Sequence, residues 1–175
     1  LNLLRSATGL PIIGPFRDIA LGCYLMTKID ESKDSAKSEK IKVYSDSFEA
    51  VMAYENGFLK LNEKIKVPDP KASLNKSKGK VELIETSVGR IIVNTSLPKE
   101  HSYINKLIDA KALKSLVREI IENYSNEEAV GFLDRIKVLG FEYCTLSGIS
   151  WGMDDLVIPK EKEQMILDAE KEIEM

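Results

Sequence analysis

The side chains best suited to bind a divalent cation are the adjacent carboxylates of Asp154 and Asp155. Carboxylate oxygens are the ligands that Mg²⁺ prefers in proteins. However, neighbouring side chains of an extended segment point to opposite faces, and no third carboxylate lies nearby at a suitable spacing. We therefore favour a loop whose backbone passes close to something large and polar, and predict no metal site. Its small residues are Ser147, Gly148, Ser150 and Gly152.

A second candidate is the segment from Gly9 to Asp18, which holds two glycines, two prolines (one of them Pro11) and Arg17. Such a segment cannot sustain a helix, and it runs directly into a predicted helix start. One interpretation is a loop that holds a polar group near a substrate. The alternative, which the residues alone favour, is a structural turn that docks the helix.

A third candidate is the segment 86–94, where Gly89 and Arg90 are adjacent within a predicted strand over residues 88–94. The pair fits either a close backbone approach with a phosphate-binding side chain or a β-bulge with an exposed arginine. The residues alone favour the bulge. The lysine-rich tract at residues 71–80 is interpreted as a solvated loop, because acidic residues surround it.

Several classes of chemistry are disfavoured by what the sequence lacks. No nucleotide-binding P-loop, nucleophile elbow, zinc-protease motif or dinucleotide fingerprint is present. Cys23 and Cys144 form no CxxC pair, so we expect reduced, packed thiols, with a single disulfide as the alternative. The one histidine, His101, has no partners at metal-ligand spacing, which argues against a structural zinc and Cys/His catalysis.

The elements that must position these loops follow from apolar periodicity and capping residues. Together they predict an α+β fold with a small mixed β region and flanking helices, followed by a mainly helical C-terminal third. We expect strands at 41–44, 63–67, 81–84 and 88–94. We expect helices over 16–28, from Asp46 to Gly57, over 113–124, from Ser125 to about Gly140, and from Pro159 to Glu174.

Bulk composition bounds the remaining possibilities. The 175 residues carry a net charge of −3, which argues against a stand-alone nucleic-acid-binding protein. The length fits one domain or two small ones. No run of about eighteen apolar residues is present, so no membrane span is expected, and no signal peptide is recognisable. The missing initiator Met and the charged helical pattern at the C-terminus suggest an internal piece of a longer chain.

Three motifs occur in the same order as in a known family. They are NLL…GLPIIGP…G.Y.MT, then TSVGRIIVN..LP, then LDRIKVLGFEY…SGIS.G.DDLVIP. The chain resembles the largest catalytic subunit of bacterial RNA polymerase, beta-prime, from Leu3 to about Glu170. The resemblance implies a pore-like α+β region over residues 1–100, of the type of domain 3 in that subunit. It also implies the start of a helical funnel region over residues 101–175.

The resemblance also implies a role. The family's catalytic Mg²⁺ is held by three aspartates of a DFDGD loop, which is absent here, so the chain carries no catalytic residue and no cofactor of its own. The implied position borders the secondary channel, through which nucleoside triphosphates enter and the RNA 3′ end is extruded. The channel-facing residues would be Gly9, Pro11, Arg17, Asp18, Arg90, Ser147, Gly148, Ser150, Gly152, Asp154 and Asp155.

By the same resemblance, the partners would be the rest of beta-prime, the beta and other polymerase subunits, template DNA, RNA and triphosphates in the bacterial cytoplasm, with no membrane. Three places depart from the family's pattern: Arg17 stands where glutamine is usual, Trp151 where isoleucine or valine is usual, and Arg5-Ser6 where Ser-Pro is expected. The alternative is an excised or divergent interaction module without polymerase activity. An aspartate-rich loop encoded upstream in the same reading frame would distinguish the first hypothesis from the second.

Overall fold

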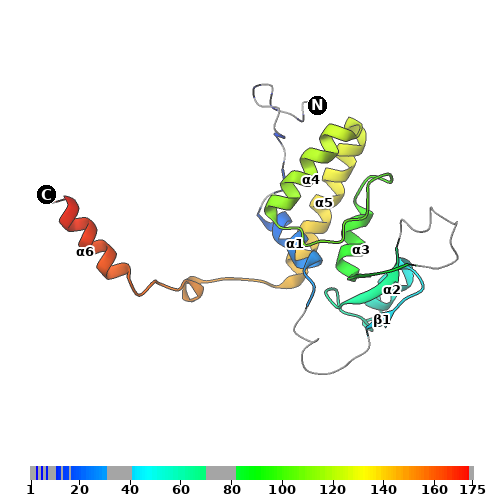
Figure 1. Cartoon of the computed structure of the whole chain (residues 1–175), viewed down its shortest axis with the longest axis horizontal. Coiled ribbons are helices and arrows are strands. Elements are labelled where there is room, and N and C mark those ends of the chain that lie inside the picture. The colour runs from blue at the N-terminus through cyan, green and yellow to red at the C-terminus, as the bar shows by residue number, and fades with distance from the viewer. Residues whose placement is uncertain are drawn as a thin grey trace.

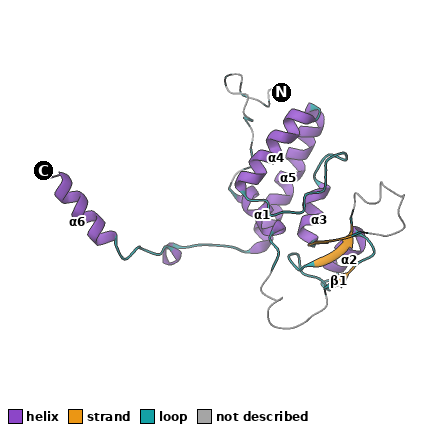
Figure 2. Cartoon of the chain, in the orientation of Figure 1, coloured by secondary structure: helices purple, strands orange, loops and turns teal. Residues whose placement is uncertain are grey.

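The computed structural model describes residues 3, 5, 7, 11, 12, 14, 15, 17–30, 41–69 and 82–173. Within them the chain is mainly helical with one small sheet, which confirms the α+β class (Figures 1 and 2). Gly9 and the lysine-rich tract at 71–80 lie outside the described residues. The elements are α1 (Asp18–Thr27), β1 (Lys42–Val43), α2 (Ser47–Glu55), β2 (Ile65–Pro68), β3 (Leu83–Thr86), α3 (Val88–Thr95), α4 (Ala110–Asn123), α5 (Asn126–Ser147), a 3-10 turn η3 (Met153–Asp155) and α6 (Lys162–Ile173).

The sheet has the order β1-β2-β3 and is mixed, as predicted. β1 pairs parallel with β2, and β2 pairs antiparallel with β3, with Ile65 opposite Thr86. Ile65 and Val67 of β2 are buried while their neighbours are less so, which is the alternation expected of a strand with one covered face. The predicted strands at 41–44, 63–67 and 81–84 are therefore confirmed, with small shifts at their ends.

The predicted strand over residues 88–94 is wrong, because this segment forms the helix α3. Its β-branched residues favour a strand only weakly, and the local capping geometry outweighs that preference. Ser87 is the N-cap, and its hydroxyl accepts a hydrogen bond from the backbone N–H of Arg90. Val88 and Ile91, three residues apart, are both buried, which is the spacing of a helix face.

The helices predicted from apolar periodicity are confirmed as α1, α2, α4, α5 and α6. The expected capping box opens α5: the Ser125 hydroxyl accepts from the N–H of Glu128, and the Glu128 carboxylate accepts from the N–H of Ser125. The Ser125 hydroxyl also donates to the Glu128 carboxylate, and this bond, together with the one from the Ser125 N–H, lowers the pKa of the Glu128 carboxyl. At the start of α2 the Asp46 carboxylate accepts from the N–H of Glu49, which caps the helix without a reciprocal bond, and Gly57, with a φ of 77°, follows its end.

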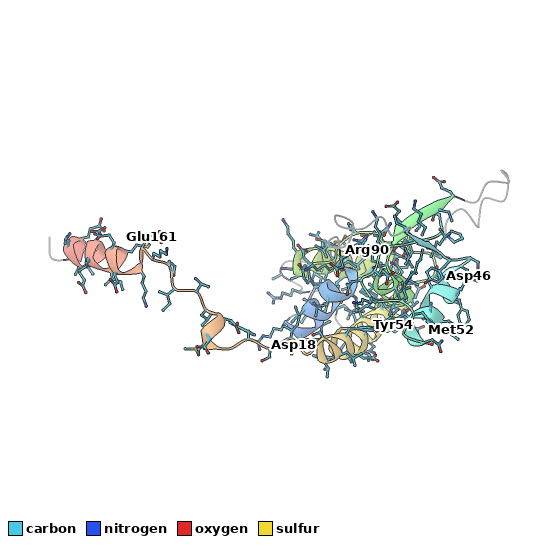
Figure 3. The ribbon with its side chains drawn as sticks, turned by 90° about the horizontal axis from the view of Figure 1, so that it is seen from below. Asp18, Asp46, Met52, Tyr54, Arg90 and Glu161 are labelled. Atoms are coloured by element: carbon cyan, nitrogen blue, oxygen red, sulfur yellow. The ribbon has the colours of Figure 1, made fainter. Side chains whose placement is uncertain are left out.

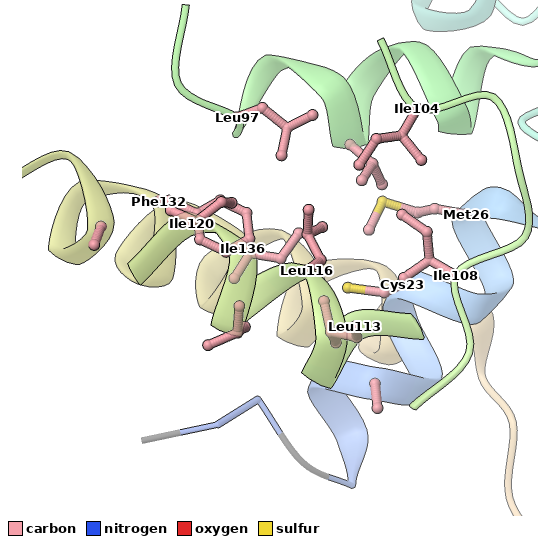
Figure 4. Close-up of a cluster of buried hydrophobic side chains, with 14 of the residues drawn as sticks. Cys23, Met26, Leu97, Ile104, Ile108, Leu113, Leu116, Ile120, Phe132 and Ile136 are labelled. Carbon is pink, nitrogen blue, oxygen red and sulfur yellow. The ribbon is translucent and has the colours of Figure 1, made fainter. Parts of the chain in front are cut away.

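Two hydrophobic clusters form the interior. The larger joins α1, α3, α4 and α5 (Figure 4), and its fully buried members include Cys23, Met26, Leu113 and Phe132. The smaller lies between α2, the sheet and α3, and consists of Ala50, Leu59, Ile65, Val67, Val88 and Ile91. Ile92 of α3 packs against both clusters, so α3 is the element that connects the sheet to the helices.

The backbones of α1 and α5 touch where two glycines meet. A Cβ added to Gly22 would lie 2.0 Å from the carbonyl oxygen of Gly140, and one added to Gly140 would lie 2.7 Å from Cγ2 of Ile19. α5 was expected to end near Gly140, but it continues to Ser147. Gly140 therefore serves a helix crossing and not a helix end.

The C-terminal part differs from the rest in its exposure. Every residue from 145 to 173 is exposed, including α6, which lies away from the body of the molecule (Figure 1). Its exposed apolar side chains are Leu146, Ile149, Trp151, Met153, Leu156, Val157, Ile158, Met165, Ile166, Leu167 and Ile173. No helix among the described residues is long and apolar enough to cross a membrane.

Candidate functional site

The predicted site residues fall into two groups at opposite ends of α1. Arg17 and Asp18 lie at its N-terminus, whereas Arg90 contacts Thr27 at its C-terminus. A ten-residue helix is about 15 Å long, so the two groups do not form one site. Figure 3 shows Asp18 and Arg90 on separate parts of the molecule.

The start of α1 lies near the C-terminal half of α5. Ile19 contacts Gly140, and Ser147 ends α5 seven residues later, about 10 Å further along the helix. Arg17 and Asp18 are both exposed. The fold thus brings one of the two predicted channel-side loops to within about two helical turns of the other.

Arg17 has an unusual backbone conformation. Its φ is 52° and its ψ is −116°, and it is the one non-glycine residue with positive φ in the described part of the chain. A side chain in this region is strained, because its Cβ crowds the backbone. Its carbonyl accepts a hydrogen bond from the N–H of Leu21 at 2.9 Å, so the first turn of α1 is formed directly after the strained residue.

The loop that follows α5 begins with a left-handed glycine. Gly148 has a φ of 62°, and a Cβ placed there would meet nothing within 4 Å. The requirement for glycine is therefore conformational and not steric. The Ser147 hydroxyl donates to the carbonyl of Cys144 at 2.6 Å and accepts from the N–H of Ile149, which fixes the start of the loop.

We expect Gly148→Ala to lower the free energy of unfolding by about 1 kcal/mol, since an L-residue in the left-handed region costs that much. Chemical denaturation of the purified chain measures it. Gly152→Ala is the matched control, because Gly152 has an ordinary φ of −120° and open space around it. Equal effects of the two substitutions would contradict the left-handed backbone conformation at Gly148.

Asp154 and Asp155 lie in the turn η3 and not in the extended segment that the sequence suggested. The Asp155 carboxylate accepts a hydrogen bond from the N–H of Gly152 at 2.8 Å. Ser150, between Gly148 and Gly152 in the sequence, is exposed. Both aspartates are exposed. In the described part of the chain, no group of three or more histidine, cysteine, aspartate or glutamate side chains is arranged to hold a metal ion.

The Arg90 guanidinium donates to three acceptors, two backbone carbonyls and one side-chain oxygen. Its Nε donates to the carbonyl of Thr27 at 3.0 Å, and its Nη1 donates to the carbonyl and to Oδ1 of Asn105 at 3.1 and 3.0 Å. Partial burial lowers the pKa of its guanidinium. Asn105 in turn donates to the carbonyl of Glu85 at 2.7 Å. Arg90 thus connects the end of α1, strand β3 and the segment before α4.

Two further residues of this polar network were not recognised in the sequence. Asn94 donates to the carbonyl of Ile104 at 2.8 Å and accepts from its N–H at 2.7 Å. The buried Thr27 hydroxyl donates to the carbonyl of Cys23 and accepts from the N–H of Ile108 at 2.9 Å. These side chains replace the backbone pairing that residues 101–109 lack, so this irregular segment is held in one conformation.

The two cysteines differ in accessibility, and both are free thiols, as predicted. Cys23 is fully buried, and its burial raises the thiol pKa to about 12, whereas Cys144 is half-buried on α5.

We expect a thiol reagent at neutral pH to modify Cys144 in the folded protein and Cys23 only after denaturation. Mass spectrometry of the labelled peptides checks this, and rapid labelling of Cys23 would show that the main core is open.

These features define a mainly helical domain, with a small mixed sheet joined to it through α3, a strained residue at the start of α1 and an exposed C-terminal arm. Residues 2–156 match the family described as RNA polymerase Rpb1, domain 3, and the chain belongs to that family.

The chain is also similar to bacterial proteins named DNA-directed RNA polymerase subunit beta'. It is 37% identical to the protein from Desulforudis audaxviator and 39% identical to that from Sulfurihydrogenibium, in each case over 99% of this chain. The protein from Bacteroides thetaiotaomicron is 36% identical over the same share. The matched region spans 14%, 10% and 12% of these relatives' own lengths. The resemblance found in the motifs is therefore confirmed.

Proposed function

We propose that this chain acts in transcription as a non-catalytic part of a DNA-directed RNA polymerase and borders the secondary channel. The observation that carries the proposal is the similarity to beta' subunits over 99% of the chain, which includes all three motifs. The proposed division is a pore-like region over residues 1–100 and the start of a funnel region over 101–175. The main core contains residues from both, so the division is one of role and not of packing.

The arrangement of the loops supports this role. The start of α1 and the 147–155 loop lie near one end of the α1–α5 pair, where Arg17 and Asp18 are exposed. The 147–155 loop is also exposed and is rich in small residues that let a backbone approach a substrate path. On this proposal Arg17 adds a permanent positive charge beside the channel. Mg²⁺ would be bound by residues outside this chain, and the isolated chain would synthesise no RNA. The partners would be the other polymerase subunits, DNA, RNA and triphosphates in the cytoplasm.

Site-specific crosslinking in the assembled enzyme tests the proposal. A photoreactive amino acid at Ser150 is expected to crosslink to the 3′-end-labelled RNA of a backtracked complex. The matched position is Lys114, which is also exposed but lies on α4. Absence of RNA crosslinks from Ser150, or equal crosslinking from both positions, would overturn the channel-side placement.

The exposed apolar side chains of residues 149–173 are also what an interaction module would present. The coding sequence upstream of Leu1 distinguishes the two proposals. An aspartate-rich loop encoded in the same reading frame supports the polymerase subunit, and a stop codon there supports the module.

A further inference from the structure

A groove of about 700 Å³ lies between the 101–109 segment and α4. Its volume falls within the range of about 300–1,000 Å³ that is usual for binding sites. Part of its lining is apolar and comes from the buried residues Ile104, Ile108 and Leu116. The rest is polar and charged, and the two ends of the groove differ in the groups that they present.

One end of the groove holds an acceptor without a donor. The side chain of His101 is 5% exposed, and its Nε2 is the one buried side-chain polar atom without a hydrogen-bond partner in the described part of the chain. Its Nδ1 lies 2.8 Å from the carbonyl oxygen of Ser102, which can only accept, so Nδ1 carries a proton. In the neutral imidazole Nε2 therefore offers a lone pair. Buried polar groups are nearly always paired, so this one requires a donor from outside the chain.

Glu119 places a second acceptor beside the first. Its Oε1 lies 3.5 Å from Nε2 of His101, and an ionised carboxylate has no proton to donate to the imidazole. The Glu119 side chain is 58% exposed, so it can rotate and admit a group from the groove without loss of packing. An arginine guanidinium fits this pair of acceptors, because it presents several N–H donors in one plane and its charge is opposite to that of the carboxylate.

The other end of the groove is positive. Lys106 and Lys111 are exposed there, and the N-terminus of α4 adds a partial positive charge. The Asp109 carboxylate caps α4 by accepting from the N–H of Ala112, and it offsets only part of the charge of the two lysines. The eight residues from Lys111 to Glu119 correspond to about 12 Å of helix. An extended peptide covers that length in about four residues.

We propose that this groove binds an extended peptide segment of a partner polypeptide. An arginine of the segment would bind Glu119 and Nε2 of His101, and a carboxylate about four residues away would bind Lys106 and Lys111. Side chains between the two would pack against the apolar part of the lining. The bound arginine supplies the donor that Nε2 lacks in the free chain. This proposal is independent of the proposed position beside the secondary channel.

NMR titration of the purified, nitrogen-15-labelled chain tests the proposal. The probe is a capped pentapeptide with arginine first, leucine third and glutamate fifth, added at about pH 8, above the range in which imidazoles usually titrate. We expect saturable amide shifts in residues 102–106 and 112–119, with a dissociation constant on the order of 1 mM. Replacement of the peptide's arginine or glutamate by glutamine is expected to weaken binding about threefold or more, the size typical of an exposed ion pair.

Three outcomes of the titration would overturn the proposal. The first is the absence of saturable shifts at the groove. The second is equal binding of the pentapeptide that lacks arginine. The third is equally tight binding of capped arginine alone, which would show a site for a small cation and not for a peptide segment.

Variants of the chain locate the contacts. Glu119→Gln is expected to weaken binding about threefold. Glu122→Gln is the matched control, because Glu122 lies on the same helix, pairs with Arg118 and does not line the groove, so it is expected to leave binding unchanged. His101→Phe keeps a ring beside Tyr124 but removes the acceptor, and it is expected to weaken binding of the arginine peptide. Equal effects of Glu119→Gln and Glu122→Gln would also overturn the proposal.

Discussion

Gly22→Ala is expected to lower the free energy of unfolding by about 2–3 kcal/mol, even though alanine is the better helix former by about 1 kcal/mol. The added methyl carbon would lie 2.0 Å from the backbone carbonyl oxygen of Gly140, and a backbone atom cannot rotate away as a side chain can. α1 and α5 must therefore separate, which opens the core around Cys23 and Phe132. Urea unfolding followed by circular dichroism measures the change.

Gly131→Ala provides the control, because Gly131 lies in α5 but away from this crossing. Its added Cβ would meet only the flexible end of Arg135, at 3.1 Å. The same substitution is therefore expected to leave stability unchanged or to raise it by up to about 1 kcal/mol. If Gly22→Ala and Gly131→Ala unfold at the same urea concentration, the two helix backbones do not touch as described.

Arg90→Ala is expected to cost about 3 kcal/mol. It removes three hydrogen bonds from a charged donor and leaves the carbonyls of Thr27 and Asn105 without that partner. Loss of the partner of a buried acceptor costs about 1–3 kcal/mol, and here that acceptor is the carbonyl of Thr27. The two Asn105 acceptors are exposed and can bind water instead, so they add little. Chemical denaturation measures the loss, and faster amide exchange in residues 104–108 would locate it.

Arg118→Ala is the comparison, because it removes an exposed arginine that pairs with Glu122 at 2.7 Å on the surface of α4. An exposed pair of this kind contributes less than about 1 kcal/mol. Similar losses for the two arginines would show that the Arg90 contacts contribute no more than a surface ion pair. Arg90→Lys is expected to lie between Arg90→Ala and the unaltered chain, since an ammonium cannot reach all three acceptors.

Much of the fold was predictable because its signals are local. The apolar spacing in α4, the capping box at Ser125 and the turn glycine at 57 each depend on residues within a few positions of one another. The segment 88–94 was misassigned because its β-branched residues carried more weight than the Ser87 cap directly before it. That cap was the signal that could have corrected the assignment.

The interactions that hold the irregular segment 101–109 could not be predicted in this way. The hydrogen bond between Thr27 and Ile108 joins residues 81 positions apart. Nothing in the residues around Asn94 indicates that its side chain binds the backbone of Ile104. The crossing of Gly22 and Gly140 has the same property, although a glycine inside a helix is itself a sign of close approach. The exposed loop over residues 147–155 was predicted correctly, but the helical turn at Asp154 and Asp155 was not, and the predicted approach of this loop to a large polar partner stays a prediction.

The length of α5 has a mechanical consequence. Its fully buried residues end at Gly140, but Tyr143 still packs against the main core, so only the final turn of α5 extends beyond the core. The loop that begins at Gly148 follows directly from this end of α5. The position of the loop relative to the core therefore depends on the stiffness of the end of α5 and on the close contact between Gly22 and Gly140. A force applied to the loop would therefore reach the core through the end of α5, where Tyr143 packs against it.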